Sequence, residues 1–171
     1  MKKTLEKINS LVELGIIRNY AIGGAMGQFY YIEPSATYDL DVMLHLNRIE
    51  NDLDPLREIY NWARKNNHEE SNEHIIIDGI PVQFLLAYNE LVSEAVDNAN
   101  KITMFTVETY VMKQEYLMAI MLQTHRNKDL IRLVKFIEES DYDKSLLENI
   151  IKKYKLTEDY NSFKEKFINN A

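Results

Sequence analysis

The stretch AIGGA at residues 21–25, followed by DLD at residues 39–41, decides the fold that this sequence predicts. An apolar strand ends in two glycines and opens a helix, and a second strand then carries two acids. Because successive side chains of a strand point to opposite faces, Asp39 and Asp41 share one face. Their mutual repulsion is relieved by a divalent cation, and hard oxygen ligands suit Mg²⁺. We therefore predict that Asp39 and Asp41 hold one or two Mg²⁺ ions.

The glycine pair predicts a place for phosphate next to these acids. Gly23 and Gly24 lack a Cβ, so a phosphate can approach the backbone, and the helix that follows offers free N–H groups. Alone, the pair is better explained as an ordinary strand-to-helix turn, but the acids that follow favour a phosphate site. Thr37 is either a hydrogen-bonding residue next to the carboxylates or an ordinary turn residue. The segment thus contains both halves of a nucleoside-triphosphate (NTP) site.

These residues resemble the signature of the nucleotidyltransferase superfamily, in which Gly-Gly or Gly-Ser precedes Asp-x-Asp. The stretches YAIGGA at 20–25 and TYDLD at 37–41 are most similar to AbiEii-type and related small bacterial nucleotidyltransferases. In addition, IPVQFL at 80–85 resembles a later core strand, and RNKD at 126–129 resembles an Arg-x-Lys-Asp element in the C-terminal helices. The resemblance covers about residues 17 to 140 and implies a nucleotidyltransferase-like α/β (α+β) fold, in which a mixed sheet is flanked by helices and followed by a helical bundle.

The resemblance also assigns catalytic roles. Related proteins usually carry a third carboxylate on a neighbouring core strand, where it helps to bind metal or acts as a general base. Here Gln83 stands at that position. An amide can offer oxygen to a metal but is a poor base, so two alternatives remain open. Either two carboxylates suffice, or the site binds nucleotide without efficient transfer.

Basic residues near position 128 are the candidates for contact with the triphosphate. Lys128 and Arg132 are four residues apart and share a helix face, and Asp129 precedes Arg132 by three. A surface ion-pair cluster explains this pattern, but the family resemblance favours Lys128 as a triphosphate ligand, assisted by Arg126. The histidines show no metal-ligand spacing, and we assign no role to His45, His68, His74 and His125.

Periodicity predicts a mixed region over residues 1–108 and a helical region over residues 109–171. In the first region we expect a hairpin around Asp78-Gly79, a favoured two-residue turn. We also expect a helix that begins at Asp54-Pro55. The remaining predictions are strands at 19–23, 39–46 and 101–107, and helices at 5–12, 24–31, 89–98, 110–123, 130–137, after Asp143 and after a Thr157 cap.

The composition argues against several classes of protein and kinds of site. The 171 residues include 20 Lys and Arg against 27 Asp and Glu, a net charge of −7, which argues against a protein that coats a nucleic-acid duplex. The absence of cysteine excludes disulfides and thiolate metal sites. Neither a signal-peptide pattern nor an apolar run of membrane-spanning length is present in the sequence. We expect a soluble cytoplasmic protein with no membrane partner.

The resemblance implies a Mg²⁺-dependent nucleotidyltransferase that moves a nucleoside monophosphate from an NTP to an unknown hydroxyl acceptor. The acceptor is RNA or a small molecule, and the protein is then either a toxin with an antitoxin partner or a small-molecule transferase. The alternative is a catalytically weak nucleotide-binding regulatory module on the same fold. A third interpretation is an interaction protein without a nucleotide site.

Overall fold

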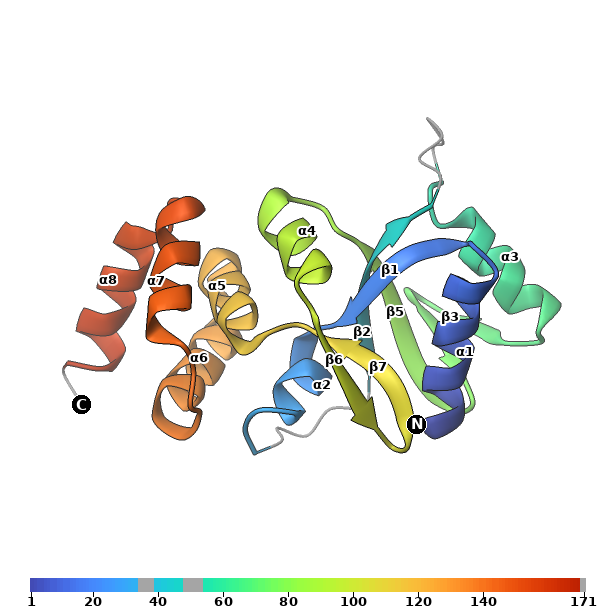
Figure 1. Ribbon diagram of the computed structural model, residues 1–171, viewed down its shortest axis with the longest axis horizontal. Coiled ribbons are helices and arrows are strands. Elements are labelled where there is room, and N and C mark those ends of the chain that lie inside the picture. Colours follow the sequence, from blue (N-terminus) through green and yellow to red (C-terminus); the bar gives the residue numbers. More distant parts are fainter. Residues whose placement is uncertain (34–38, 48–53, 170–171) are drawn as a thin grey trace.

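A computed structural model describes residues 1–33, 39–47 and 54–169 (Figure 1). It contains a seven-stranded mixed sheet with helices on both faces, followed by a group of C-terminal helices. This architecture confirms the predicted fold class. Across the sheet, the strands lie in the order β3 (Glu69–Ser71), β4 (His74–Ile77), β5 (Ile80–Leu86), β2 (Leu40–Leu46), β1 (Ile17–Ile22), β7 (Val107–Val111) and β6 (Asn100–Met104).

The central strands carry the two predicted motifs. Strand β2 pairs antiparallel with β1 and parallel with β5, and β1 pairs parallel with β7. The outer pairs β3–β4, β4–β5 and β6–β7 are antiparallel. Strand β1 leads directly into α2 (Gly24–Phe29) at the glycine pair, and α2 contacts β2. The glycine motif and the acidic motif therefore lie on adjacent strands near the middle of the sheet.

Two helices cover one face of the sheet. Helix α1 (Lys2–Glu13) contacts β1 and β7, and its Leu5, Ile8 and Leu11 recur at helical spacing and are fully buried. Helix α3 (Arg57–Lys65) buries Ile59 and Trp62 in the same hydrophobic cluster. The opposite face is covered by α4 (Glu90–Asp97), which contacts β1 and β2, and by α2.

The C-terminal helices are α5 (Gln114–Thr124), α6 (Asn127–Glu139), α7 (Lys144–Lys153) and α8 (Thr157–Phe167). Helix α5 is central, because it contacts α2, α4, α6, α7 and α8. A single hydrophobic cluster extends from Ala21 and Met43 of the sheet to Phe136 and Phe163 of these helices. The C-terminal helices therefore share their core with one sheet face. In the described part of the chain, no helix combines the length and apolar character needed to cross a membrane.

Several predicted boundaries are wrong. The region predicted as one strand at 101–107 is a hairpin of β6 and β7, which turns at Phe105 and Thr106, both at positive φ. Residues 110 and 111, predicted to be helical, belong to β7. Phe-Thr is not a sequence typical of a tight turn, so the pattern gave no sign of this reversal. The division after residue 108 stays a prediction, although the last strand ends at Val111 and α5 begins at Gln114.

Two helix starts and one strand also differ from the expectation. Helix α3 begins at Arg57 with Leu56 at the N-cap, because Asp54 and Pro55 form a preceding turn, in which the Asp54 carbonyl accepts a hydrogen bond from Arg57 N–H at 3.1 Å. Thr157 is the first residue of α8 and not its cap. Strand β3 was not predicted, because its glutamates are unfavourable in strands and its side chains are exposed.

Candidate active site

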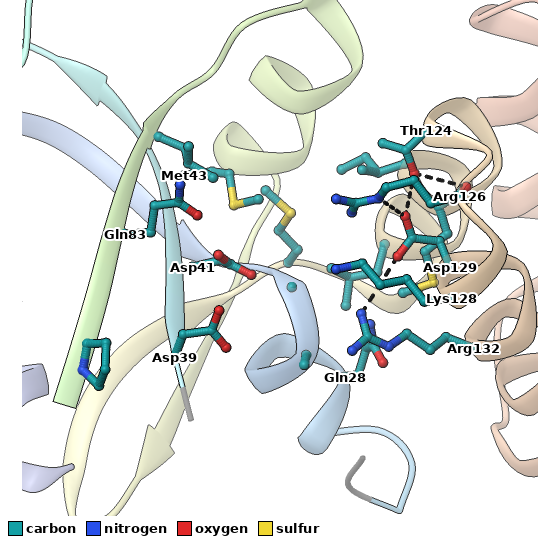
Figure 2. A pocket seen from close by; sticks show the side chains of 18 of the residues that line it. Gln28, Asp39, Asp41, Met43, Gln83, Thr124, Arg126, Lys128, Asp129 and Arg132 are labelled. Carbon is teal, nitrogen blue, oxygen red and sulfur yellow. Dashed lines mark hydrogen bonds and ion pairs between the residues drawn. The ribbon is translucent and has the colours of Figure 1, made fainter. Parts of the chain in front are cut away.

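A cavity of about 820 Å³ lies between the sheet and the first two C-terminal helices (Figure 2). One side, here called the sheet wall, carries Asp39, Asp41, Gln83 and His74. The other side, here called the helix wall, carries Arg126, Lys128, Asp129 and Arg132 from the beginning of α6. The fold therefore brings together most of the predicted site residues, although the two groups are far apart in the sequence.

Strand register positions the sheet wall. In the parallel β2–β5 ladder, Asp41 lies opposite Gln83. Because side chains alternate along a strand, Asp39 and Asp41 both line the cavity, whereas Leu40 between them is buried in the cluster on the other face. Figure 2 shows both carboxylates directed toward the helix wall. The structure thus places the two acids on one face, as the alternation predicted.

Burial and mutual repulsion make this pair of acids unfavourable. Burial raises the pKa of Asp41 above its ordinary value, and the charge of Asp39 raises it further. The positive charges of His74, Lys128 and Arg126 act in the opposite direction, but the pKa remains raised. A divalent cation at the pair would remove the repulsion. The two carboxylates fit Mg²⁺, which usually combines one or two carboxylates with substrate phosphates. Among the described residues, no group of three or more His, Asp or Glu has a geometry that could hold a metal.

Gly24 gives the Asp41 carboxylate its place. A Cβ on Gly24 would lie 1.7 Å from Asp41 Oδ2, and the φ of Gly24 is +54°, a value that other residues rarely adopt. Gly23 N–H donates a hydrogen bond of 2.9 Å to the Asp41 carbonyl. Gly24 lines the cavity, whereas a Cβ on Gly23 would meet the Met43 side chain. The glycine pair therefore joins α2 closely to the acidic strand, and contact with phosphate stays a prediction.

Gln83 occupies the position next to Asp41 at which the resemblance implies a third carboxylate. Its Nε2 donates a hydrogen bond of 2.8 Å to Oε2 of Glu73, in the turn between β3 and β4. The ladder therefore puts Gln83 next to the acidic pair, and its correspondence to a third carboxylate stays a prediction. The side chain at this position is an amide tied to the neighbouring hairpin.

The helix wall is built around a buried carboxylate. Helix α5 ends at Thr124, and the following residue, His125, is left-handed and turns the chain into α6. Asp129 is only 2% exposed, and its Oδ2 accepts hydrogen bonds from Thr124 Oγ1 at 2.8 Å and Arg126 Nε at 2.6 Å. Arg132 Nη1 lies 3.6 Å from Asp129 Oδ1. Asp129 therefore fixes both guanidinium groups at the cavity (Figure 2).

Lys128 points across the cavity toward Asp39 and Asp41 in Figure 2. It lowers the pKa of Asp41 by its positive charge. The cavity thus has an acidic side and a basic side, an arrangement suited to a metal-bound polyphosphate between them. Thr37, the remaining predicted site residue, lies outside the described residues.

Sequence reasoning missed three cavity residues. Asp129 was interpreted as part of a surface cluster, but the spacing of Arg126 and Arg132, each three residues away, was a sign of its role. His74 received no role, yet it lines the sheet wall. Gln28 of α2 lines the cavity and is only 4% exposed, and its carboxamide has no hydrogen-bond partner among the described residues. No motif pointed to Gln28.

The rest of the cavity is mainly apolar. Its apolar lining comes from β2, β5, α5 and the chain before α5, and includes Met43, Leu85, Met112, Leu117, Ile120 and Met121. Tyr88 lies at the same cavity with an exposed side chain. An apolar surface next to charged walls is typical of pockets that take a ring system together with a charged group.

No protein-family model matches the sequence, and no curated protein matches it. Solved structures are similar in fold. An antigenic nucleotidyltransferase-like protein from Paracoccidioides brasiliensis is 14% identical, with a TM-score of 0.57 over 94% of this chain and 89% of that chain. The antibiotic-resistance factor ANT(2'')-Ia is 12% identical, with a TM-score of 0.46 over 96% of this chain and 89% of that chain. The chain has the fold of a nucleotidyltransferase-like protein.

Proposed function

We propose that this protein is a Mg²⁺-dependent nucleotidyltransferase, which moves a nucleoside monophosphate from an NTP to a hydroxyl acceptor. The observation that carries this proposal is the placement of Asp39 and Asp41 across one cavity from Lys128, Arg126 and Arg132. Carboxylates that can hold Mg²⁺, facing cations that can neutralise phosphate oxygens, are the two parts that phosphoryl-group transfer requires. The nucleotidyltransferase-like fold supports the proposal.

The residues act by position and charge. Asp39 and Asp41 would hold Mg²⁺, which neutralises charge on the triphosphate when bound. Lys128 contacts phosphate oxygens as a point charge, and Arg126 and Arg132 offer planar donor pairs. The acceptor oxygen forms a bond to the α-phosphorus while the bond from the α-phosphorus to the leaving oxygen breaks, which releases pyrophosphate.

The subfamily of the protein and the acceptor of the reaction are also proposals. The YAIGGA and TYDLD motifs support an AbiEii-type protein, and with it a toxin acting on RNA with an antitoxin partner in the cytoplasm. A small-molecule acceptor is the other option within this class. The net charge of −7 gives the RNA option little support, because RNA binding favours a basic surface.

Gln83 favours a second candidate function, a nucleotide-binding regulatory module. Its amide stands next to Asp41, where a third carboxylate is expected, and it is bonded to Glu73. A module of this kind would bind Mg²⁺–NTP and transfer slowly. Gln83→Asp would then raise the transfer rate about 100-fold or more, the usual contribution of a placed base.

Calorimetry with each NTP, with and without Mg²⁺, tests the site. We expect binding only with Mg²⁺, and we expect it to disappear when Asp39→Asn and Asp41→Asn are combined. Glu158→Gln with Asp159→Asn is the matched control, because it removes two exposed acids on α8 and should leave affinity unchanged. Unchanged affinity in the Asp39/Asp41 variant would remove the metal site. Pyrophosphate release and label transfer to a mixed RNA and metabolite pool then separate the enzyme from the module.

A further inference from the structure

A row of cavity-lining side chains crosses the sheet wall beyond Gln83. In the antiparallel β4–β5 ladder, Ile75 lies opposite Val82. When this register is continued by one residue, it puts His74 next to Gln83, which is itself opposite Asp41. Asp41, Gln83 and His74 all line the cavity, so they project from the same face of three neighbouring strands. His74 is thus the next side chain after the position where a third carboxylate is expected.

The imidazole of His74 is available for a ligand. Its side chain is half-buried in the sheet wall, and it has no hydrogen-bond or ion-pair partner among the described residues. It lies close enough to the acidic pair to lower the pKa of Asp41 when the imidazole carries a proton. Strands are spaced by about 4.8 Å, so His74 lies roughly 10 Å from Asp41 across the sheet. That span leaves room for an α-phosphate and an acceptor hydroxyl between them.

The other cavity-lining groups of the described chain are poorly suited to accept a proton. Asp39 and Asp41 are assigned to the cation. Asp129 is held by Arg126 and by the Thr124 hydroxyl. Tyr88 is a phenol, whose ordinary pKa of about 10 keeps the hydroxyl protonated at neutral pH. The arginine and lysine side chains of the helix wall are assigned to the phosphate oxygens.

We propose that His74 is the general base of the transfer reaction, in place of the missing third carboxylate. The inference rests on the proposed function. The neutral imidazole takes the proton from the acceptor hydroxyl while the acceptor oxygen bonds to the α-phosphorus. The bond from the α-phosphorus to the leaving oxygen breaks at the same time, and pyrophosphate carries away that electron pair. Imidazole suits this task because it exchanges protons near neutral pH.

The proposal is tested with His74→Ala and with His74→Gln as a second variant. The probe is an α-labelled NTP with Mg²⁺ and a mixed RNA and metabolite pool. We expect Mg²⁺–NTP affinity to be unchanged by calorimetry, which also shows that the fold is intact. Transfer should fall about 100-fold or more. Added imidazole should restore transfer in His74→Ala, a response that a purely structural role would not give. His45→Ala, at a histidine of β2 that lies outside the cavity, should transfer at the wild-type rate.

Three results would overturn the proposal. The first is wild-type transfer by both His74 variants. The second is a loss of transfer that imidazole does not restore. The third is wild-type transfer by His74→Ala together with its loss in Glu73→Gln, because this would assign the base to the carboxylate that Gln83 holds. A wild-type protein that binds no NTP would overturn the proposed function itself, which keeps that failure distinct from these three.

Discussion

The two walls of the cavity are held in place by different interactions. On the sheet wall, backbone ladders set the positions of Asp41 and Gln83. On the helix wall, Arg126 and Arg132 are held by side-chain contacts with one buried carboxylate, Asp129. A substitution on the sheet wall should therefore change chemistry and leave geometry intact. A substitution at Asp129 should change the geometry of the wall.

The largest expected effect comes from Gly24→Ala, which tests the close packing of α2 against Asp41 on the sheet wall. The new Cβ would lie 1.7 Å from Asp41 Oδ2, at a φ of +54°. We expect a loss of about 3 kcal/mol in the free energy of unfolding, from strain and steric displacement together. Mg²⁺–NTP binding should also be lost, because Asp41 must move. Urea unfolding and calorimetry measure both effects.

Two other glycines serve as controls for this prediction. Gly79 has a φ of +78° but open space where a Cβ would lie, so Gly79→Ala should cost only about 1 kcal/mol of backbone strain. Gly23 has a negative φ, and its Cβ would meet the flexible Met43 side chain, which can move. A Gly24→Ala protein as stable as Gly79→Ala would show that Asp41 is not packed against α2.

Asp129→Asn is expected to have the next largest effect. Asparagine retains an oxygen for Thr124 but loses the charge that holds Arg126 and Arg132. Removing one partner of a buried charged network is costly, and we expect a loss of about 2 kcal/mol since Arg126 is largely exposed. NTP affinity should fall as well, because the guanidinium groups are no longer fixed.

Asp97→Asn is the matched control for Asp129→Asn. Asp97 pairs with Arg18 and His45 at the surface, where ion pairs contribute about 0.5 kcal/mol. Denaturant unfolding and calorimetry should separate the two variants. Equal stability and equal NTP affinity in both would mean that Asp129 does not organise the helix wall, and the contrast between the walls would disappear.

The sheet wall could be predicted from the sequence to a large extent. The alternation of Asp39 and Asp41 required only the period of a strand, and Gln83 lies on the strand next to them. The predicted hairpin around Asp78-Gly79 also contained the position of His74, since a two-residue turn there puts His74 opposite Gln83. Metal-ligand spacing along the chain does not reveal this position, because the neighbours of His74 lie across the sheet.

The helix wall could be predicted only in part. The RNKD stretch drew attention to Lys128, but burial of Asp129 depends on how α5 and α6 pack. The left-handed turn at His125, which brings Arg126 next to Asp129, has no glycine or asparagine to indicate it. The burial of Gln28 could not be predicted either, because it depends on tertiary packing between α2 and α5. Spacing along the chain does not encode such contacts.

A smaller effect is expected from Asp41→Asn on the protein without metal or nucleotide. Burial and the charge of Asp39 raise the pKa of Asp41, so folding disfavours its ionised form. The resulting penalty is present above the raised pKa and disappears below the ordinary value of 3.8. Asp41→Asn should therefore raise Tm at neutral pH and not at acid pH. A lower Tm at neutral pH would show that the carboxylate stabilises the empty site.

The smallest effect is expected from Glu94→Gln, which tests how the two walls are held relative to each other. Glu94 is on α4, which packs on the sheet. It accepts a hydrogen bond from Tyr116 of α5. It also accepts hydrogen bonds from Lys153 and Tyr154 at the end of α7. Burial acts to raise the pKa of Glu94, but these hydrogen bonds outweigh burial and lower it.

Because its folded-state pKa is lowered, Glu94 stabilises the protein above the ordinary value of 4.5, and this contribution is lost as the pH falls through the lowered pKa. Urea unfolding should show Glu94→Gln to be less stable than wild type at neutral pH, with a difference that closes in acid. Glu90→Gln, at an exposed acid of the same helix, is the matched control. NTP affinity should change less than in Asp129→Asn, because the hydrophobic cluster shared by α4, α5 and α7 still joins the walls. If Glu94→Gln instead weakens NTP binding as much as Asp129→Asn, the separation of the walls depends on this polar contact and not on the shared core.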